Sequence, residues 1–147
     1  MSTQWNTALR RASLLLALAG VVVVGMGCGS GPPDDIDRVN TTFVLTVTVY
    51  GHDQQPVAGE PVTFVARTIN SSGFPTSSTT FTQAVGTNAS GRATYSAGFM
   101  VSRNETIEVR YSVAEGASGR MLWPWSACWG AAQFGSATVA ADRNLYY

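Results

Sequence analysis

The sequence predicts an all-β fold, a sandwich of two antiparallel sheets with about six to eight strands. Three observations lead to this prediction. Between residues 42 and 113 the apolar residues recur with a period of two, which is the spacing of half-buried strands. Turns rich in Gly, Pro, Asn and Ser separate these segments, and no stretch has a convincing helical period. Strands with one apolar and one polar face are what two packed sheets require.

The first 27 residues have the composition of an export signal. Arg10 and Arg11 precede an uncharged apolar run of about fifteen residues, and small residues follow it. This is the secretory pattern, and the run is shorter than the roughly twenty residues that span a bilayer. We therefore expect residues 1–27 to be a signal peptide and the protein to be exported.

Cys28 follows Gly27 and precedes further small residues, and this stretch resembles the lipobox of bacterial lipoproteins. In that family the cysteine is diacylated and becomes the mature N-terminus, so the resemblance implies lipid attachment at Cys28. Such a lipid would hold the protein at a membrane, because each buried methylene adds about 0.8 kcal/mol of affinity. Cleavage without a lipid and an uncleaved signal anchor remain alternatives. Residues 28–40, rich in Gly, Pro and Asp, predict a short lipidated tether.

The strands follow the tether, within a module that we assign to residues 41–147. In the first strand Phe43, Leu45 and Val47 share one face, whereas Thr46 and Thr48 lie on the other. The same alternation recurs along the chain, and glycines in the turns supply positive φ where it is needed. Such a set of strands indicates a sandwich of the immunoglobulin-like type. The expected strands lie in TTFVLTVTVY, PVTFVARTI, TTFTQAVG, GRATYSAGF, ETIEVRYSV and about FGSATVA.

Residues 42–113 also resemble the bacterial Ig-like domains of the invasin and intimin type. The resemblance rests on the Pro-Val-Ala-Gly turn at 56–59, which joins two alternating strands, and on a later hairpin that contains Thr87, Gly91 and Ala93. It implies a surface-exposed spacer or adhesion module without catalytic residues.

Residues 119–132 form an insertion that this family pattern lacks. Its segment MLWPWSACWG holds three of the four tryptophans of the chain. The insertion lies in a connection that is longer than most loops, and it would suit an extra hairpin turning at PWSA. We favour packing of the rings over the open end of the sandwich. The alternatives are that Trp123, Trp125 and Trp129 bind a protein or carbohydrate partner, or that they lie at a membrane interface.

Cys128 lies in the same insertion. Acylation of Cys28 would leave Cys128 as a free thiol in an oxidising compartment. We favour a buried thiol over an intermolecular disulfide. If Cys28 is retained without a lipid, a disulfide between the two cysteines would join the tether to the insertion.

The sequence contains no pattern that predicts catalysis or a metal site. The single histidine, His52, lies beside Asp53 in a turn without a nucleophile motif, and we expect it to face water. One histidine and two distant cysteines do not supply the ligands of a zinc site. Glu105 and Glu108 lie near arginines and are expected to form surface ion pairs. We therefore expect no enzyme, no metal and no cofactor.

The charge of the chain limits its partners. The formal net charge is zero, and removal of the leader with its two arginines leaves an excess of acids, which disfavours nucleic-acid binding. The sequence thus predicts a non-enzymatic cell-envelope lipoprotein, an Ig-like binding or structural module that faces the periplasm or the cell surface. The alternative is a self-assembling subunit of an envelope complex or appendage, joined as a homo-oligomer by strand addition or by the Trp-rich insertion.

Overall fold

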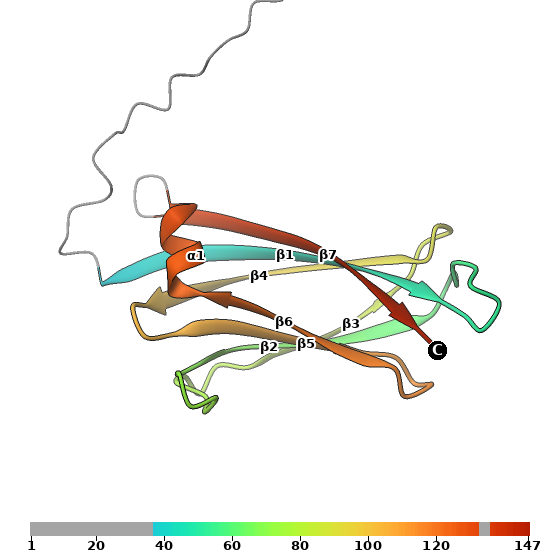
Figure 1. Cartoon of the computed structure of the whole chain (residues 1–147), viewed down its shortest axis with the longest axis horizontal. Helices are drawn as coiled ribbons and strands as arrows, with labels where there is room; N and C mark the ends of the chain where they lie inside the picture. Colours follow the sequence, from blue (N-terminus) through green and yellow to red (C-terminus); the bar gives the residue numbers. More distant parts are fainter. Residues whose placement is uncertain (1–36, 133–135) are drawn as a thin grey trace, which may run out of the picture.

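Two β-sheets packed face to face form the fold (Figure 1). The computed structural model describes residues 37–132 and 136–147. One sheet has the strand order β4-β1-β7, and the other has the order β3-β2-β5-β6. The predicted all-β sandwich is confirmed, with seven strands in the described part of the chain. These elements are β1 (Arg38–Tyr50), β2 (Pro61–Ile69), β3 (Phe81–Gly86), β4 (Arg92–Ser102), β5 (Thr106–Ser112), β6 (Ser118–Pro124), α1 (Trp125–Gly130) and β7 (Ser136–Tyr146).

The core lies between the two sheets and follows the alternation in the sequence. Phe43 on β1 is fully buried, and its ring lies 5.6 Å from the ring of Trp123 on β6, centroid to centroid. Aromatic contacts of this kind add to the hydrophobic stabilisation of a core. The fully buried apolar side chains come from both sheets and include Leu45, Val47, Val49, Val62, Phe64, Val101, Ile107 and Val109.

β1 is the central strand of the first sheet. It pairs antiparallel with β4, where Thr41 lies opposite Phe99, and parallel with β7, where Thr41 lies opposite Ala137. The parallel pair departs from the antiparallel arrangement that the sequence predicted. It arises because β6 ends, and α1 follows, at the end of the sandwich where β1 begins; β7 starts at that same end in the other sheet and therefore runs in the same direction as β1 (Figure 1).

The insertion does not form a hairpin at PWSA, and this prediction is wrong. The hairpin lies earlier, between β5 and β6, where Gly116 has a φ of 91° and Val113 N donates to Ala117 O at 3.0 Å. Pro124 ends β6, because its fixed φ and missing N–H suit the start of a helix, and α1 follows directly. β1 also begins at Arg38, so residues 38–40, which the sequence assigned to the tether, belong to the sheet.

The turn after β1 is locked to the turn before β4. Thr87 Oγ1 donates to Val57 O at 2.6 Å and accepts from Glu60 N at 2.9 Å. Gly91 has the predicted positive φ, at 71°, and a Cβ there would lie 2.8 Å from Pro56 Cβ. Glycine is therefore required at this position for both conformational and steric reasons.

Candidate functional site

One end of the sandwich carries a partly exposed aromatic group next to Asp37, the first described residue. Figure 1 shows α1 beside the start of β1 and the end of β4. Arg103, in the turn after β4, donates from its backbone N to Asp37 O at 3.1 Å, and its Nε lies 3.9 Å from Asp37 Oδ1. We use the term aromatic end for Arg103, Trp125 and Trp129.

The side chains of the aromatic end contact one another. Trp125 and Trp129 are four residues apart on α1 and therefore lie on the same helix face. Their rings stack with centroids 4.9 Å apart. The guanidinium carbon of Arg103 lies 5.4 Å from the Trp125 ring centroid, within the range of a cation–π interaction. The group therefore combines a large apolar surface with one half-exposed positive charge.

A shallow pocket of about 300 Å³ opens beside Trp125. Trp125 Nε1 is buried and, within the described residues, has no hydrogen-bond partner. Leaving such a buried donor unpaired costs about 1–3 kcal/mol. The pocket is lined by Ser71, Arg103, Asn104, Glu105, Thr106, Pro124, Trp125 and Ser126.

The structure separates the three tryptophans that the sequence analysis grouped together. Trp123 points into the core and is only 5% exposed, whereas Trp125 and Trp129 are half-buried at the surface. Alternation on β6 places Trp123 inward, and the change from strand to helix at Pro124 breaks that alternation for the next residues. Trp123 thus packs the core, and Trp125 and Trp129 remain accessible to a partner.

The cysteines are placed only in part. Cys128 is a fully buried free thiol on α1. Burial raises the pKa of the Cys128 thiol, and a hydrogen bond with Thr41 opposes this only partly. Cys28, the predicted site of lipid attachment, lies outside the described residues, as do the signal peptide and most of the tether.

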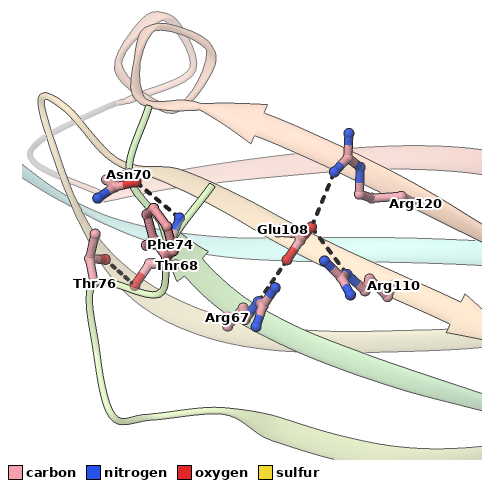
Figure 2. Close-up of polar contacts among 8 residues, drawn as sticks. All are labelled: Arg67, Thr68, Asn70, Phe74, Thr76, Glu108, Arg110 and Arg120. Atoms are coloured by element: carbon pink, nitrogen blue, oxygen red, sulfur yellow. Dashed lines mark hydrogen bonds and ion pairs between the residues drawn. The ribbon is translucent and has the colours of Figure 1, made fainter. Parts of the chain in front are cut away.

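A second cluster lies on the outer face of the β3-β2-β5-β6 sheet, and sequence reasoning found only its members on β5. Figure 2 shows Glu108 on β5 surrounded by Arg67 from β2, Arg110 from β5 and Arg120 from β6. Arg67 Nε donates to Glu108 Oε2 at 2.7 Å. Arg110 Nε and Arg120 Nη1 donate to Glu108 Oε1 at 3.2 Å and 3.5 Å. We call these four residues the arginine cluster.

Glu108 forms the predicted ion pair with a neighbouring arginine, Arg110, at 3.2 Å, but the carboxylate is not exposed to water as a surface pair would be. Its side chain is only 2% exposed, although it lies on the outer face, because the three arginines cover it. Burial by itself raises the pKa of Glu108. The hydrogen bonds and positive charges of Arg67 and Arg110 together lower it by more than burial raises it, so the pKa lies below its ordinary value. Glu108 is therefore ionised at neutral pH.

Glu105 also differs from its predicted role as a surface ion pair. Its Oε2 accepts a hydrogen bond from Ser102 N at 2.8 Å and so closes the turn between β4 and β5. The neighbouring loop after β2 is held in a similar way (Figure 2), since Asn70 Oδ1 accepts from Phe74 N at 3.0 Å and Thr76 donates to Thr68 at 2.9 Å.

The structure also places His52 and limits where a metal site or a membrane-spanning helix could lie. His52 is exposed in the turn after β1, as the sequence predicted. Within residues 37–132 and 136–147, no group of three or more His, Cys, Asp or Glu side chains could hold a metal ion. In the same part of the chain no helix is long and apolar enough to cross a membrane.

The fold defines this protein as a two-sheet β-sandwich with seven strands in its described part. No protein-family model matches the chain, and no curated protein matches it. Among solved structures it is similar to chlorocatechol 1,2-dioxygenase from Pseudomonas putida, with 8% identity, a TM-score of 0.41 and coverage of 74% of this chain and 61% of that one. A mutant catechol 1,2 dioxygenase from Acinetobacter radioresistens has 10% identity and a TM-score of 0.39, with 74% and 52% covered.

A third similar structure is the dioxygenase domain of a dioxygenase and carbohydrate-binding fusion from Streptomyces sp. SirexAA-E. It has 13% identity and a TM-score of 0.39, and the match covers 81% of this chain and 82% of that one. The chain thus spans only about half to three fifths of the first two neighbours.

These neighbours correct the prediction that the chain is not an enzyme. All three are dioxygenases, so the assignment to a non-enzymatic class is contradicted and we withdraw it. At 8–13% identity the likeness concerns the fold alone, and it assigns no reaction to this chain.

Proposed function

We propose that this protein is an Ig-like binding or structural module that a lipid on Cys28 holds at a bacterial membrane surface. The observation that carries the proposal is the contact of Asp37 with Arg103, which places the entry of the chain at the aromatic end. Asp37 lies nine positions after Cys28, and such a length of chain extends at most roughly 30 Å. A lipid at Cys28 would therefore keep the aromatic end close to the membrane.

The aromatic end has the chemistry of a membrane-interface contact. Trp rings favour the boundary between headgroups and hydrocarbon, because one edge is polar and the rest is apolar. Arg103 adds a positive charge beside Trp125, which anionic headgroups attract. Trp125 and Trp129 would then supplement the lipid anchor and set the orientation of the sandwich on the membrane.

The anchor is tested by the intact mass of the mature protein extracted from membranes. A diacylglyceryl group on Cys28 as the first residue is the expected result. A mature protein that begins elsewhere, or that carries Cys28 without a lipid, would refute the anchor.

The orientation is tested by Trp fluorescence in vesicles that contain brominated lipids, which quench only tryptophans at the membrane. Quenching should be strong in the mature protein and nearly absent after Trp125→Phe combined with Trp129→Phe. The matched control is Trp123→Phe, which removes a core ring and should leave the quenching unchanged. Equal quenching in all three proteins would mean that another surface faces the membrane.

Assembly into a homo-oligomer is a second proposal, which the edge strand β3 favours. β3 pairs with β2 along one side, and all of its residues except Val85 are exposed. An edge of this kind offers unpaired backbone groups to an added strand. Phe81 and Phe74 next to it are 38% and 67% exposed and would add apolar contact. Sedimentation of the detergent-solubilised protein should then show dimers or larger species, and only monomer at high concentration would exclude this assembly.

A further inference from the structure

The outer face of the β3-β2-β5-β6 sheet contains a pocket of about 510 Å³ next to the arginine cluster. Its walls come from two neighbouring rows of side chains that cross three strands. One row consists of hydroxyls, since Thr63 lies opposite Ser112 and Ser112 lies opposite Ser118. The next row contains Arg110 directly opposite Arg120. All five of these residues line the pocket.

The arginine pair is not balanced by the residues around it. Like charges directly opposite one another destabilise a sheet. Glu108 contributes one negative charge to three arginines, which leaves an excess of two positive charges on this face. The shortest bond of Glu108 is the one to Arg67, at 2.7 Å, whereas its bonds to Arg110 and Arg120 are longer, at 3.2 Å and 3.5 Å. The negative charge of Glu108 therefore neutralises mainly the charge of Arg67 and leaves those of Arg110 and Arg120 less compensated.

The donors of Arg110 and Arg120 remain accessible beside the pocket. Their side chains are 57% and 56% exposed. Thr63, Ser112 and Ser118 line the same pocket and are at least partly exposed. Two guanidinium groups and three hydroxyls thus face one small volume, and the acceptor that the two guanidinium groups share, Glu108 Oε1, is bonded only at 3.2 Å and 3.5 Å.

We propose that this pocket binds a phosphate group, with Arg110 and Arg120 as the charged ligands and Thr63, Ser112 and Ser118 as hydroxyl donors. Arginine forks match phosphate oxygens in a bidentate manner. Five donor side chains suit a group with three or four oxygens better than a carboxylate with two. Glu108 competes with the phosphate for the two arginines and at the same time holds their side chains in place.

The site is distinct from the aromatic end and does not depend on the proposed membrane anchor. Ser112 ends β5 and Ser118 begins β6, so the hydroxyl row lies toward the end of the sandwich opposite α1, which follows the other end of β6 (Figure 1). This position favours a soluble phosphorylated molecule over the headgroup of a lipid in the same membrane.

The test is calorimetric titration of the full-length protein in nonionic detergent with inorganic phosphate, and separately with short-chain phosphatidylglycerol. Saturable binding of inorganic phosphate is expected, and Arg110→Gln and Arg120→Gln should each weaken it by about tenfold or more. Arg110→Lys, which retains the charge but loses the fork, should weaken it less. Arg92→Gln is the matched control on the other sheet and should bind as the unmodified protein does.

Glu108→Gln gives an opposite expectation. Removal of the competing carboxylate should tighten phosphate binding severalfold. Circular dichroism checks that the variant retains the native strand signal. If it does not fold, the test of the proposal rests on the Arg110 and Arg120 variants. Binding of the lipid analogue alone, with the same dependence on Arg110 and Arg120, would assign the phosphate site to a headgroup. The proposal is overturned if neither titrant binds, or if the two arginine variants bind no more weakly than Arg92→Gln.

Discussion

Arg67 Nε lies 2.7 Å from Glu108 Oε2 and joins β2 to β5 through the most buried ion pair of the described chain. The Glu108 carboxylate is almost completely covered, so it depends on its partners for the stabilisation that water would otherwise supply. The ion pairs of Glu108 therefore differ from exposed ion pairs, because one partner is almost completely buried. They connect three strands through one acceptor.

Arg67→Gln is expected to lower the free energy of unfolding by about 2–3 kcal/mol, because it removes a charge-assisted hydrogen bond to a buried carboxylate. Arg92→Gln breaks an exposed pair with Asp142, at 3.4 Å, and should change the free energy by no more than about 0.5 kcal/mol. Urea unfolding of both variants measures the difference. Equal effects would show that the Arg67 contact contributes nothing beyond a surface pair.

Acid should weaken the fold through Glu108. Its pKa lies below the ordinary value of 4.5, because the hydrogen bonds and charges of Arg67 and Arg110 outweigh the effect of burial. A carboxyl whose pKa is lowered by folding stabilises the protein above its ordinary pKa, and this stabilisation is lost as the pH falls through the lowered pKa.

Urea midpoints at about pH 6 and about pH 3 should therefore differ more for the unmodified protein than for Glu108→Gln. The difference between the two proteins isolates Glu108 from other acids such as Glu105, whose pKa is also lowered. An identical loss in both proteins would mean that Glu108 does not contribute to the pH dependence.

Thr87→Val should destabilise the fold by about 1–3 kcal/mol, although it nearly preserves the shape of the side chain. The substitution leaves Val57 C=O and Glu60 N–H without their partner, and Thr87 is only 7% exposed. Thr138→Val on the exposed face of β7 is the matched control and should have little effect. Thermal unfolding of the two variants compares them directly.

Gly119→Ala should destabilise the protein by about 1–3 kcal/mol. A Cβ at Gly119 would collide with the ring of Tyr111, which lies opposite on β5 and is only 5% exposed. Gly98→Ala provides the comparison, because a Cβ there meets only Thr41 O, at 4.0 Å. That second substitution should be neutral or stabilising. A neutral Gly119→Ala would show that the Tyr111 ring moves aside at no cost.

Trp123→Ala and Trp129→Ala should differ sharply in stability. Trp123 packs on Phe43 in the core, and its loss is expected to cost about 3–5 kcal/mol. Trp129 is half-buried and contacts Trp125 at the surface, so its loss should cost about 1 kcal/mol. Melting temperatures report both effects. Similar large losses in both variants would place Trp129 in the core as well.

Local patterns determined much of what the sequence predicted correctly. The alternation in β1, from Phe43 to Val49, follows from the period of a strand and needs no knowledge of its neighbours. The positive φ of Gly91 is likewise a local property of a tight turn. The export signal and the lipobox-like Cys28 are also read from consecutive residues, but they lie outside the described residues and stay predictions.

Tertiary structure alone decided which residues meet. The alternation placed Glu108 and Arg110 together on the outer face of β5, but only the register of β2, β5 and β6 brings Arg67 and Arg120 to the same carboxylate. The parallel course of β7 and the different positions of Trp123 and Trp125 depend on where α1 lies. The physical reason is that a period specifies which face a residue occupies, whereas its neighbours on that face come from strands distant in the chain.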